Sequence, residues 1–234
     1  MLIYSQPEDA KDVDCPYIEG ERFTQRYAFL SDLEPDEFDM MLFNGWRHFG
    51  NFFFTPNCKS CTSCTPIRTK IMDFKFSKSQ KRNYKKNSAI VNVKFTSLEY
   101  SDDIYEVYKN HSKIKFNQKT SVKEFKESFF VDALKGSSKL SLFYIEKKLV
   151  GVGFLDVSQS GISSIYFCYD PDYSSYGLGV YSVLKEIEYG KELNKDYYYL
   201  GFYIKGNKSM EYKNRYTPNQ ILSWEHGEWV PFVD

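Results

Sequence analysis

The chain has 234 residues, of which 42% are hydrophobic, so it is long and apolar enough to bury a core and does not have the composition of a disordered protein. Its formal net charge is zero, which excludes a uniformly basic or uniformly acidic protein. No stretch approaches the roughly 20 apolar residues of a membrane span, and the first ten residues lack the basic and apolar parts of a signal peptide, so we expect a cytoplasmic protein without a membrane partner.

The overall neutrality hides a division of charge along the chain. Residues 1–44 carry eleven acids and three bases, whereas residues 68–94 carry nine bases and one acid. The basic part includes "SKSQKRNYKKN" with Tyr84, and such a cluster can neutralise phosphates and stack on a base. It therefore indicates either nucleic-acid binding or a solvated helix face. The residues that would contact RNA phosphates are Lys81, Arg82, Lys85 and Lys86.

The first predicted helix lies in "LEPDEFDMMLFNGW". Pro35 suits its first turn, Phe38 and Leu42 share an apolar face, and Gly45 ends it. An aromatic run and a group of cysteines follow, and we expect them in loop or strand.

Three of the five cysteines fall within seven residues, at Cys58, Cys61 and Cys64. An odd total and a reducing compartment both argue against disulfides. Together with Cys15 they form a set of four thiolates that suits Zn²⁺ or an iron–sulfur cluster. The alternative is four reduced thiols that pack a small subdomain. Cys168 lies among aromatic residues in a predicted strand, and we expect it in the core.

Two further helices are predicted in the middle of the chain. Ser101 caps "SDDIYEVYKNHSK", in which apolar positions recur at i, i+3, i+4 and i+7 from Ile104. Ser121 and Glu124 form a capping-box pattern that opens the next helix.

After residue 138 the periodicity changes from helix to strand. The runs "KLSLFYIE", "KLVGVGFLDV" and "GISSIYFCYD" are rich in β-branched and aromatic residues, and they predict an antiparallel meander. A glycine-containing turn leads into "VYSVLKEIEYGKEL", a helix whose apolar stripe is Val180, Val183, Leu184 and Ile187. "DYYYLGFYI" returns as a strand, "NKSMEYKNRY" is helix-like, and "EWVPF" completes the chain.

This order of elements resembles the acyltransferase core called the GNAT fold, in which three strands precede a glycine loop, a helix and another strand. Such cores hold the coenzyme A pyrophosphate on backbone amides at the helix start, with Gln or a basic residue opening the signature. Here "SSYGLG" has Ser174 at that position, which argues against coenzyme A. We predict an α+β fold, with a GNAT-like catalytic region at residues 98–234 and a small cysteine-containing, basic region at residues 1–97.

Longer strings resemble one enzyme family, the aminoacyl-tRNA protein transferases. "GWRHFGNFFFTPNC", "CTPIR" and "FSKSQKRNYKKN" are similar to their N-terminal region, and "SSIYFCYDPDYSSYGLGVYSVLKEIEY" and "SMEYKNRYTPNQIL" to their catalytic region. The similarity runs from Cys15 to Phe232. It implies an enzyme that adds one amino acid from an aminoacyl-tRNA to the N-terminal α-amine of proteins beginning with Asp or Glu, which marks them for degradation in the N-degron pathway.

The resemblance is divided between two branches. The cysteine group is similar to the bacterial enzymes that transfer leucine, whereas "LGVYSVLKEI", "YYYLGFYI" and "WVP" are closer to the eukaryotic arginyltransferases. We predict an arginyltransferase, with leucyl transfer as the alternative and, from another class, a non-catalytic reader of acidic N-termini. A buried arginyl side chain needs carboxylate partners. The acids beside the predicted glycine loop are Asp170, Asp172 and Glu186.

The implied reaction is aminolysis of the ester between the amino acid and the tRNA. An α-amino group titrates at about 7.7 to 8.0, so the site mainly has to orient the reactants and stabilise an oxyanion. Asp156 matches a family position and is the predicted carboxylate that orients or deprotonates the amine; otherwise it caps a turn. Ser164 and Tyr166, alternating inward with Ile162, are predicted to offer hydroxyls to the terminal adenosine or the oxyanion, unless they are ordinary strand residues.

Substrate binding sets two further requirements. An N-terminal Asp or Glu presents a carboxylate, which the fork of an arginine reads best. Arg47, Arg68 and Arg82 are the candidates, with surface solvation or phosphate contact as the alternative. Tyr212 and Lys213 in "MEYK" are predicted to hold the ribose or phosphate of the tRNA, unless they form an exposed helix turn.

Overall fold

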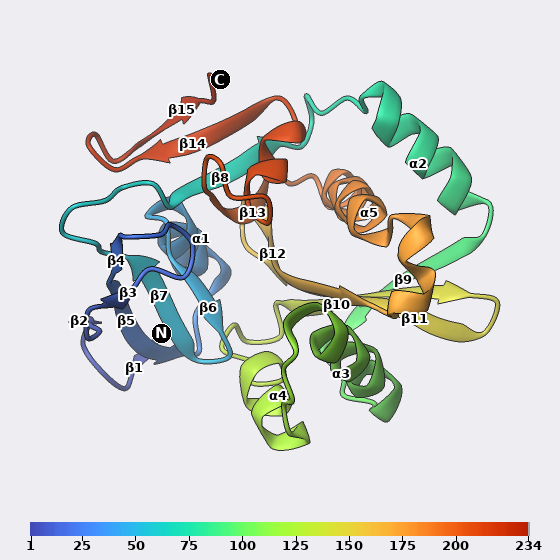
Figure 1. The fold of residues 1–234 in the computed structure, drawn as a ribbon, viewed down its shortest axis with the longest axis horizontal. Coiled ribbons are helices and arrows are strands. Elements are labelled where there is room, and N and C mark those ends of the chain that lie inside the picture. The colour runs from blue at the N-terminus through green and yellow to red at the C-terminus, as the bar shows by residue number, and fades with distance from the viewer. Residues whose placement is uncertain (234) are drawn as a thin grey trace.

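The computed structural model describes residues 1–233, which form a mixed α and β structure (Figure 1). Its helices are α1 (Pro35–Phe43), α2 (Lys78–Ser88), α3 (Asp102–Phe116), α4 (Val122–Phe129) and α5 (Leu178–Glu192), with 3-10 helices η1 (Pro171–Tyr176) and η2 (Glu211–Arg215). The strands are β1 (Leu2–Ile3), β2 (Glu8–Asp9), β3 (Val13–Asp14), β4 (Arg22–Phe23), β5 (Gln25–Ser31), β6 (Arg47–Phe49), β7 (Phe52–Pro56), β8 (Thr65–Lys70), β9 (Val91–Ser97), β10 (Ser138–Ile145), β11 (Lys148–Val157), β12 (Gly161–Tyr169), β13 (Tyr197–Tyr203), β14 (Asn219–Ser223) and β15 (Glu228–Pro231).

The described strands form one large sheet and two smaller ones. The large sheet has eight strands in the order β15-β14-β8-β13-β12-β11-β10-β9. A five-stranded sheet contains β1, β5, β7 and β6 in that order, with β2 also paired to β5, and β3 pairs with β4. Every neighbouring pair in the large sheet is antiparallel except β12 and β13, which are parallel because α5 carries the chain from one to the other.

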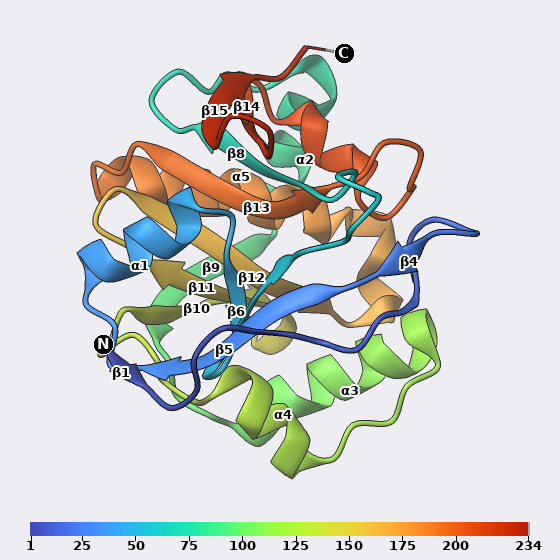
Figure 2. The ribbon, with the colours of Figure 1, turned by 90° about the vertical axis from the view of Figure 1, so that its left-hand side faces the viewer.

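The parallel pair is short, and this opens the sheet. β12 and β13 pair only over three positions, from Gly161 and Tyr197 to Ser163 and Tyr199. Beyond them β12 continues beside β11 and β13 continues beside β8, so the two strands spread apart (Figure 2). The backbone therefore leaves a gap in the middle of the sheet into which other elements can place side chains.

Helices and the smaller sheet cover the two faces of the large sheet. α5 packs on β12 and β13, and α2 packs on α5 (Figure 1). α3 packs on β11 and β12, and its apolar residues share a core cluster with Phe125 of α4. α1 and the five-stranded sheet share a cluster with Tyr199 of β13. The gap thus lies between a helical layer and a second sheet.

Most predicted elements are confirmed. α1 begins at Pro35, the Ser101 hydroxyl accepts from the Ile104 N–H at 3.4 Å, and Ser121 and Glu124 form a capping box. The meander is formed by β10, β11 and β12. Two expectations are wrong. Val180 is 37% exposed rather than part of the buried stripe of α5, and only Glu211–Arg215 of the helix-like segment is helical, as a 3-10 turn.

The expected boundary near residue 98 does not divide the large sheet. β8 and β9 come from the N-terminal region, yet β8 lies between β13 and β14, and β9 lies at the edge beside β10. Among the described helices none is both long and apolar enough to span a bilayer.

Candidate functional site

Strand β6 sends neighbouring side chains to opposite faces of the five-stranded sheet. Successive residues in a strand alternate, so Arg47 lies on the face of its cross-strand partner Phe54, and His48 on the face of Phe53. The Arg47 face meets the gap beside β13, because Phe54 packs against Phe202 at 6.5 Å between ring centroids. His48 instead stacks on Phe53 at 4.6 Å.

Arg47 enters the gap as a buried cation with an unused hydrogen-bond donor. Its side chain donates through Nη2 to the backbone carbonyl of Ser164 on β12, and the residue is 8% exposed. Nη1 is buried and has no partner among the described residues. Burial lowers the pKa of Arg47 to about 10, against the opposing charge of Asp156. The guanidinium therefore has a donor available for a ligand in the gap.

Lys213 is a second buried cation beside Arg47. Its Nζ donates to the carbonyl of Phe202 at 2.8 Å and lies 3.2 Å from Met210 Sδ. Burial, with a smaller contribution from the charge of Arg47, lowers the pKa of Lys213 to about 7. In the described chain neither cation forms an ion pair with an acid. Burying unpaired charge is unfavourable, so the pair favours an anionic ligand.

Gly201 of β13 lies beside both cations. A side chain there would begin 3.6 Å from Lys213 Nζ and 3.9 Å from Arg47 Nε and Nη2. Gly201 also has a φ of 86°, in the left-handed region that disfavours other residues. Glycine at this position therefore keeps the space beside both cations free of a side chain.

An apolar hollow of about 240 Å³ adjoins Lys213. Phe202 and Met210, which contact the Lys213 amine, belong to its lining. Gln25 is a polar side chain in this lining, which contains no acid. The remaining lining residues are Tyr17, Phe23, Phe49, Phe52, Phe54, Pro56, Cys64 and Ile204. The hollow therefore suits an apolar group joined to a charged or polar one.

Asp156 lies at the end of β11 and is 2% exposed. One of its oxygens contacts His48 Nε2 at 2.7 Å, and the other accepts from the Ser138 hydroxyl at 2.6 Å. His48 Nδ1 lies 2.8 Å from the Gly50 carbonyl, which can only accept, so Nδ1 carries a proton. Asp156 is thus held by His48 and Ser138, and its charge acts on Arg47.

The sequence interpretation missed His48, to which it assigned no chemistry. His48 and Asp156 are 108 residues apart, and nothing in the local pattern pairs them. The available signal was the alternation along "WRHF": once Arg47 is placed in a strand, His48 must face the other way.

The expected alternation of Ser164 and Tyr166 is wrong. The pairing of β11 with β12 shifts so that Phe154 faces Tyr166 and Leu155 faces Ser164, which leaves Ile165 as a bulge. Ser164 contacts Tyr198 on the side of α5, whereas the Tyr166 ring packs 5.4 Å from that of Phe129 of α4. The two hydroxyls therefore lie on opposite faces of the sheet.

Glu186 lies in the core beneath the gap rather than at a donor pocket. It is fully buried, and its carboxylate accepts from the hydroxyls of Tyr198 and, at 3.1 Å, Ser141. Burial raises the pKa of Glu186 to about 7. Asp170 instead pairs with Lys148 at 2.8 Å, and Asp172 is exposed. The structure does not bring these three predicted donor-binding acids together.

The basic residues of α2 face solvent, and we call them the α2 basic face: Lys81, Arg82, Lys85 and Lys86. Lys86 also donates to the Ser175 carbonyl at 3.0 Å. Tyr84 is not available to stack on a base, contrary to expectation, because its hydroxyl donates to Glu188 at 3.0 Å and its ring packs on Tyr181. Tyr212 is 40% exposed, unlike its neighbour Lys213.

The three arginines proposed for acceptor binding occupy separate places. Only Arg47 enters the gap. Arg68 lies on β8, 5% exposed, with its guanidinium carbon 3.6 Å from the Tyr197 ring centroid. Arg82 is exposed on α2.

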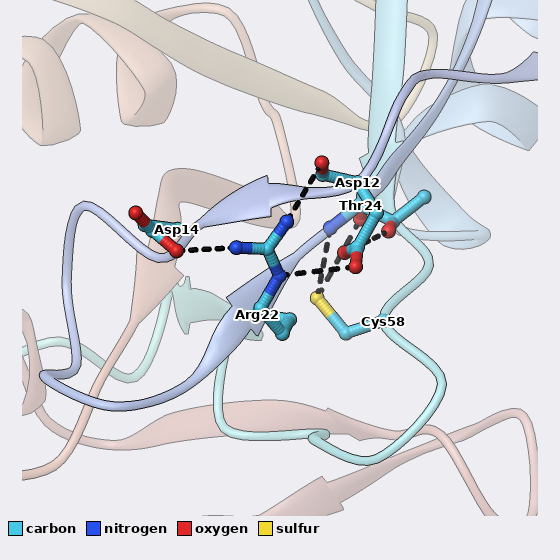
Figure 3. A network of polar contacts seen from close by, with 5 residues as sticks. All are labelled: Asp12, Asp14, Arg22, Thr24 and Cys58. Atoms are coloured by element: carbon cyan, nitrogen blue, oxygen red, sulfur yellow. Dashed lines mark hydrogen bonds and ion pairs between the residues drawn. The ribbon is translucent and has the colours of Figure 1, made fainter.

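Four cysteines line another hollow of about 210 Å³, which we call the cysteine hollow: Cys15, Cys58, Cys61 and Cys64. The backbone N–H of Thr24 donates to Cys58 Sγ at 3.4 Å, next to Arg22, which pairs with two acids (Figure 3). Burial, with the neighbouring thiols, raises the pKa of Cys64 to about 12. Within residues 1–233 no three His, Cys, Asp or Glu side chains have an arrangement that could hold a metal ion. Cys168 is fully buried, as expected.

Comparison with known proteins identifies relatives of both halves of the chain. Residues 13–82 match the family described as arginine-tRNA-protein transferase, N terminus, and residues 101–223 match the C terminus of the same family. An aspartate/glutamate leucyltransferase of Campylobacter jejuni is 37% identical over 213 residues, covering 89% of each chain. The protein of the same name from Helicobacter hepaticus is 36% identical, and the match covers 89% of this chain and 88% of the relative. The one from Acinetobacter baumannii is 31% identical, and the match covers 92% of this chain and 80% of the relative.

Two solved structures share the fold at low sequence identity. The crystal structure of FemX matches with a TM-score of 0.53 at 10% identity, covering 75% of this chain and 62% of FemX. The C-terminal DUF2156 domain of a putative lysylphosphatidylglycerol synthetase from Agrobacterium fabrum matches with a TM-score of 0.50 at 9% identity, covering 72% of this chain and 58% of that one.

Proposed function

Because the chain belongs to the aminoacyl-tRNA protein transferase family and is an aminoacyltransferase, we propose that it transfers leucine from leucyl-tRNA to the N-terminal amine of proteins beginning with Asp or Glu. The observation that carries this proposal is an apolar hollow beside two buried, unpaired cations at the open end of the β12 and β13 pair. We propose that the hollow binds the leucyl side chain of the donor and that the two cations bind the acidic side chain of the acceptor. The fold that positions them is, we propose, a GNAT-like acyltransferase core.

The apolar hollow supports leucine rather than arginine as the donor residue. A guanidinium buried there would have no carboxylate partner, since the hollow has none in its lining. Of the acids expected to bind the guanidinium, Glu186 lies in a core network, Asp170 forms an ion pair and Asp172 lies in an exposed turn. The names of the curated relatives also favour the leucyl alternative. Our expectation of arginyl transfer has support only from the description of the family.

Arg47 and Lys213 are the proposed partners of the acceptor carboxylate. The free Nη1 of Arg47 supplies a charge-assisted hydrogen bond. A bound carboxylate would raise the pKa of Lys213 from about 7, so that Lys213 carries a second positive charge when the acceptor is in place. An acidic side chain bound there would relieve the cost of two buried cations. An acceptor beginning with Asn has a similar shape but lacks this charge, so it should be a poor substrate.

In the proposed reaction the acceptor amine attacks the ester carbonyl of leucyl-tRNA. A C–N bond forms, the bond from the carbonyl carbon to the tRNA ribose oxygen breaks, and the amine proton ultimately replaces that bond on the ribose hydroxyl. Because the amine titrates at about 7.7 to 8.0, it needs little help from a base. We propose that Asp156, held by His48 and Ser138, stabilises the positive charge that develops on the attacking amine.

Two other regions complete the proposal. The α2 basic face would bind the phosphates of the tRNA, since the side chains of Lys81, Arg82 and Lys85 form no ion pair or hydrogen bond within the described chain. The thiols of the cysteine hollow are the chemical type that suits Zn²⁺ or an iron–sulfur cluster, but they do not converge as ligands do, so the metal stays a prediction. The product would carry a new N-terminal leucine, which we place in a cytoplasmic N-degron pathway.

A transfer assay with labelled leucyl-tRNA and arginyl-tRNA tests the donor. We expect leucine to be attached to a peptide beginning with Asp, and much less to a matched peptide beginning with Asn. Gln25→Glu, which adds a carboxylate to the apolar hollow at nearly constant shape, should lower leucyl transfer, whereas Gln6→Glu on the exposed N-terminal segment should not. Transfer of arginine at least as fast as leucine by the unaltered enzyme would overturn the leucyl proposal.

A further inference from the structure

A separate hollow of about 310 Å³ lies between α1 and the closed end of the β12 and β13 pair. Asp39 of α1 and Arg68 of β8 contribute to its lining, as do Tyr197 and Tyr199 of β13. It shares no lining residue with the apolar hollow, with the cysteine hollow or with a further small hollow that His48 and Asp156 help to line. Nothing in the transfer reaction described above uses it.

Arg68 gives this hollow a fixed positive group. Its Nε donates to Gln220 Oε1 at 3.0 Å and its Nη1 to the Tyr199 hydroxyl at 3.2 Å, while Nη2 has no partner among the described residues. The guanidinium carbon lies 3.6 Å from the Tyr197 ring centroid and 4.3 Å from that of Trp229. Two rings and two hydrogen bonds thus hold the guanidinium in place, with one donor group left over.

Asp39 gives the hollow a negative group. Its Oδ2 accepts from the Ser160 N–H at 2.9 Å, which ties α1 to the start of β12. Its Oδ1 is buried and has no partner within the described chain. Asp39 and Arg68 also form no ion pair with each other there. Two opposite charges therefore face one hollow without neutralising each other, and each has an unused hydrogen-bonding atom.

The rim of the hollow is apolar. Met40 and Phe43, the α1 residues beside Asp39, are 59% and 47% exposed. Exposed side chains of this size next to a charged floor indicate a ligand with an apolar part.

We propose that this hollow binds a free α-amino acid with an apolar side chain, at a site distinct from the transfer centre. The ammonium group of the ligand would donate to Asp39 Oδ1, and its carboxylate would accept from Arg68 and from the Tyr199 hydroxyl. The apolar side chain would contact Met40 and Phe43. A lone anion would be repelled by Asp39 and a lone cation by Arg68, so the site requires both charges in one small molecule.

Calorimetric titration of the purified full-length chain, without tRNA, tests this binding. Leucine should bind saturably, and 4-methylpentanoate and 3-methylbutylamine, which each keep the same apolar part but lose one charge, should bind at least about tenfold more weakly. Glycine should also bind more weakly than leucine, because it cannot reach the rim. These comparisons use the unaltered protein, so they do not depend on the folding of a variant.

Asp39→Asn locates the site, because Asn keeps an oxygen for the Ser160 N–H but loses the negative charge. It should weaken leucine binding by about tenfold or more, whereas Asp36→Asn, on the same helix but outside the hollow, should not. Absence of saturable leucine binding, or equal binding by Asp39→Asn, would overturn the proposal. Tighter binding of the dipeptide Asp-Ala that also requires Asp39 would overturn it too, since the occupant would then be a peptide N-terminus.

Discussion

Replacing Lys213 by Met should stabilise the protein while it impairs transfer. Burial lowers the pKa of Lys213 from 10.5 to about 7, and no acid pairs with it in the described chain. Each pKa unit corresponds to about 1.4 kcal/mol, so below pH 7 the charged amine costs on the order of 5 kcal/mol of folding free energy. Loss of the hydrogen bond to Phe202 offsets about 1 kcal/mol of the gain.

The pH dependence of this effect has a defined sign. Between pH 7 and 10.5 the unfolded chain binds a proton at Lys213 that the folded chain does not, so stability of the unaltered protein rises with pH through this window. The cost of Lys213 therefore falls to about 2 kcal/mol at pH 9. Lys213→Met should accordingly show its largest stabilisation at pH 6, and that difference should shrink at pH 9.

Urea denaturation at the two pH values measures the stability, and the leucyl-transfer assay measures the activity of the same samples. Transfer to a peptide beginning with Asp should fall roughly 10- to 100-fold, the effect of losing a charged hydrogen-bond partner. Lys208→Met, at an exposed lysine nearby in the chain, should change neither quantity. A destabilised Lys213→Met protein at pH 6, or one that retains full transfer, would refute the assignment of an unpaired buried cation to the acceptor site.

Three further predictions concern the other parts of the proposed enzyme. Asp156→Asn should lower the turnover rate far more than it weakens tRNA binding, because it keeps the shape but removes the charge; unchanged turnover in single-turnover assays would exclude the electrostatic role. Replacing all four residues of the α2 basic face by Ala should weaken tRNA binding and make the affinity depend less on salt concentration, because fewer counterions are released. If filter-binding titrations show the same slope of affinity against salt concentration, the face does not contact tRNA phosphates. If the cysteine hollow holds a metal, anaerobic purification should yield about one Zn²⁺ or one iron–sulfur cluster per chain, and elemental analysis that finds neither would support packed thiols.

Local patterns predicted the helices and the meander because their causes are local. The cap at Ser101 and the capping box at Ser121 and Glu124 act over three residues, and they begin α3 and α4 as expected. The bulge at Ile165 was not predictable in this way, because it arises from the register between β11 and β12. Alternation counted along β12 alone therefore placed Tyr166 on the wrong face.

The candidate site was predicted only in part for the same reason. Arg47, Asp156 and Lys213 were identified from the resemblance, but their surroundings depend on contacts distant in sequence. His48 reaches Asp156 across 108 residues, and Glu186 is buried by a sheet that forms around it. Tertiary packing determines which charged residues lie at the gap and which lie in the core. A single sequence does not show directly which side chains are buried.

The position of β8 has a consequence for how the chain is made. β8 is synthesised early, but both of its partners, β13 and β14, lie more than a hundred residues later, as the contact between Arg68 and Tyr199 across 131 residues illustrates. A growing chain thus carries a strand with two open edges until β13 and β14 leave the ribosome, and such edges promote aggregation. Closing so distant a contact is also slow. Chains that end before β13 would therefore lack both the gap and the partners that cover the edges of β8.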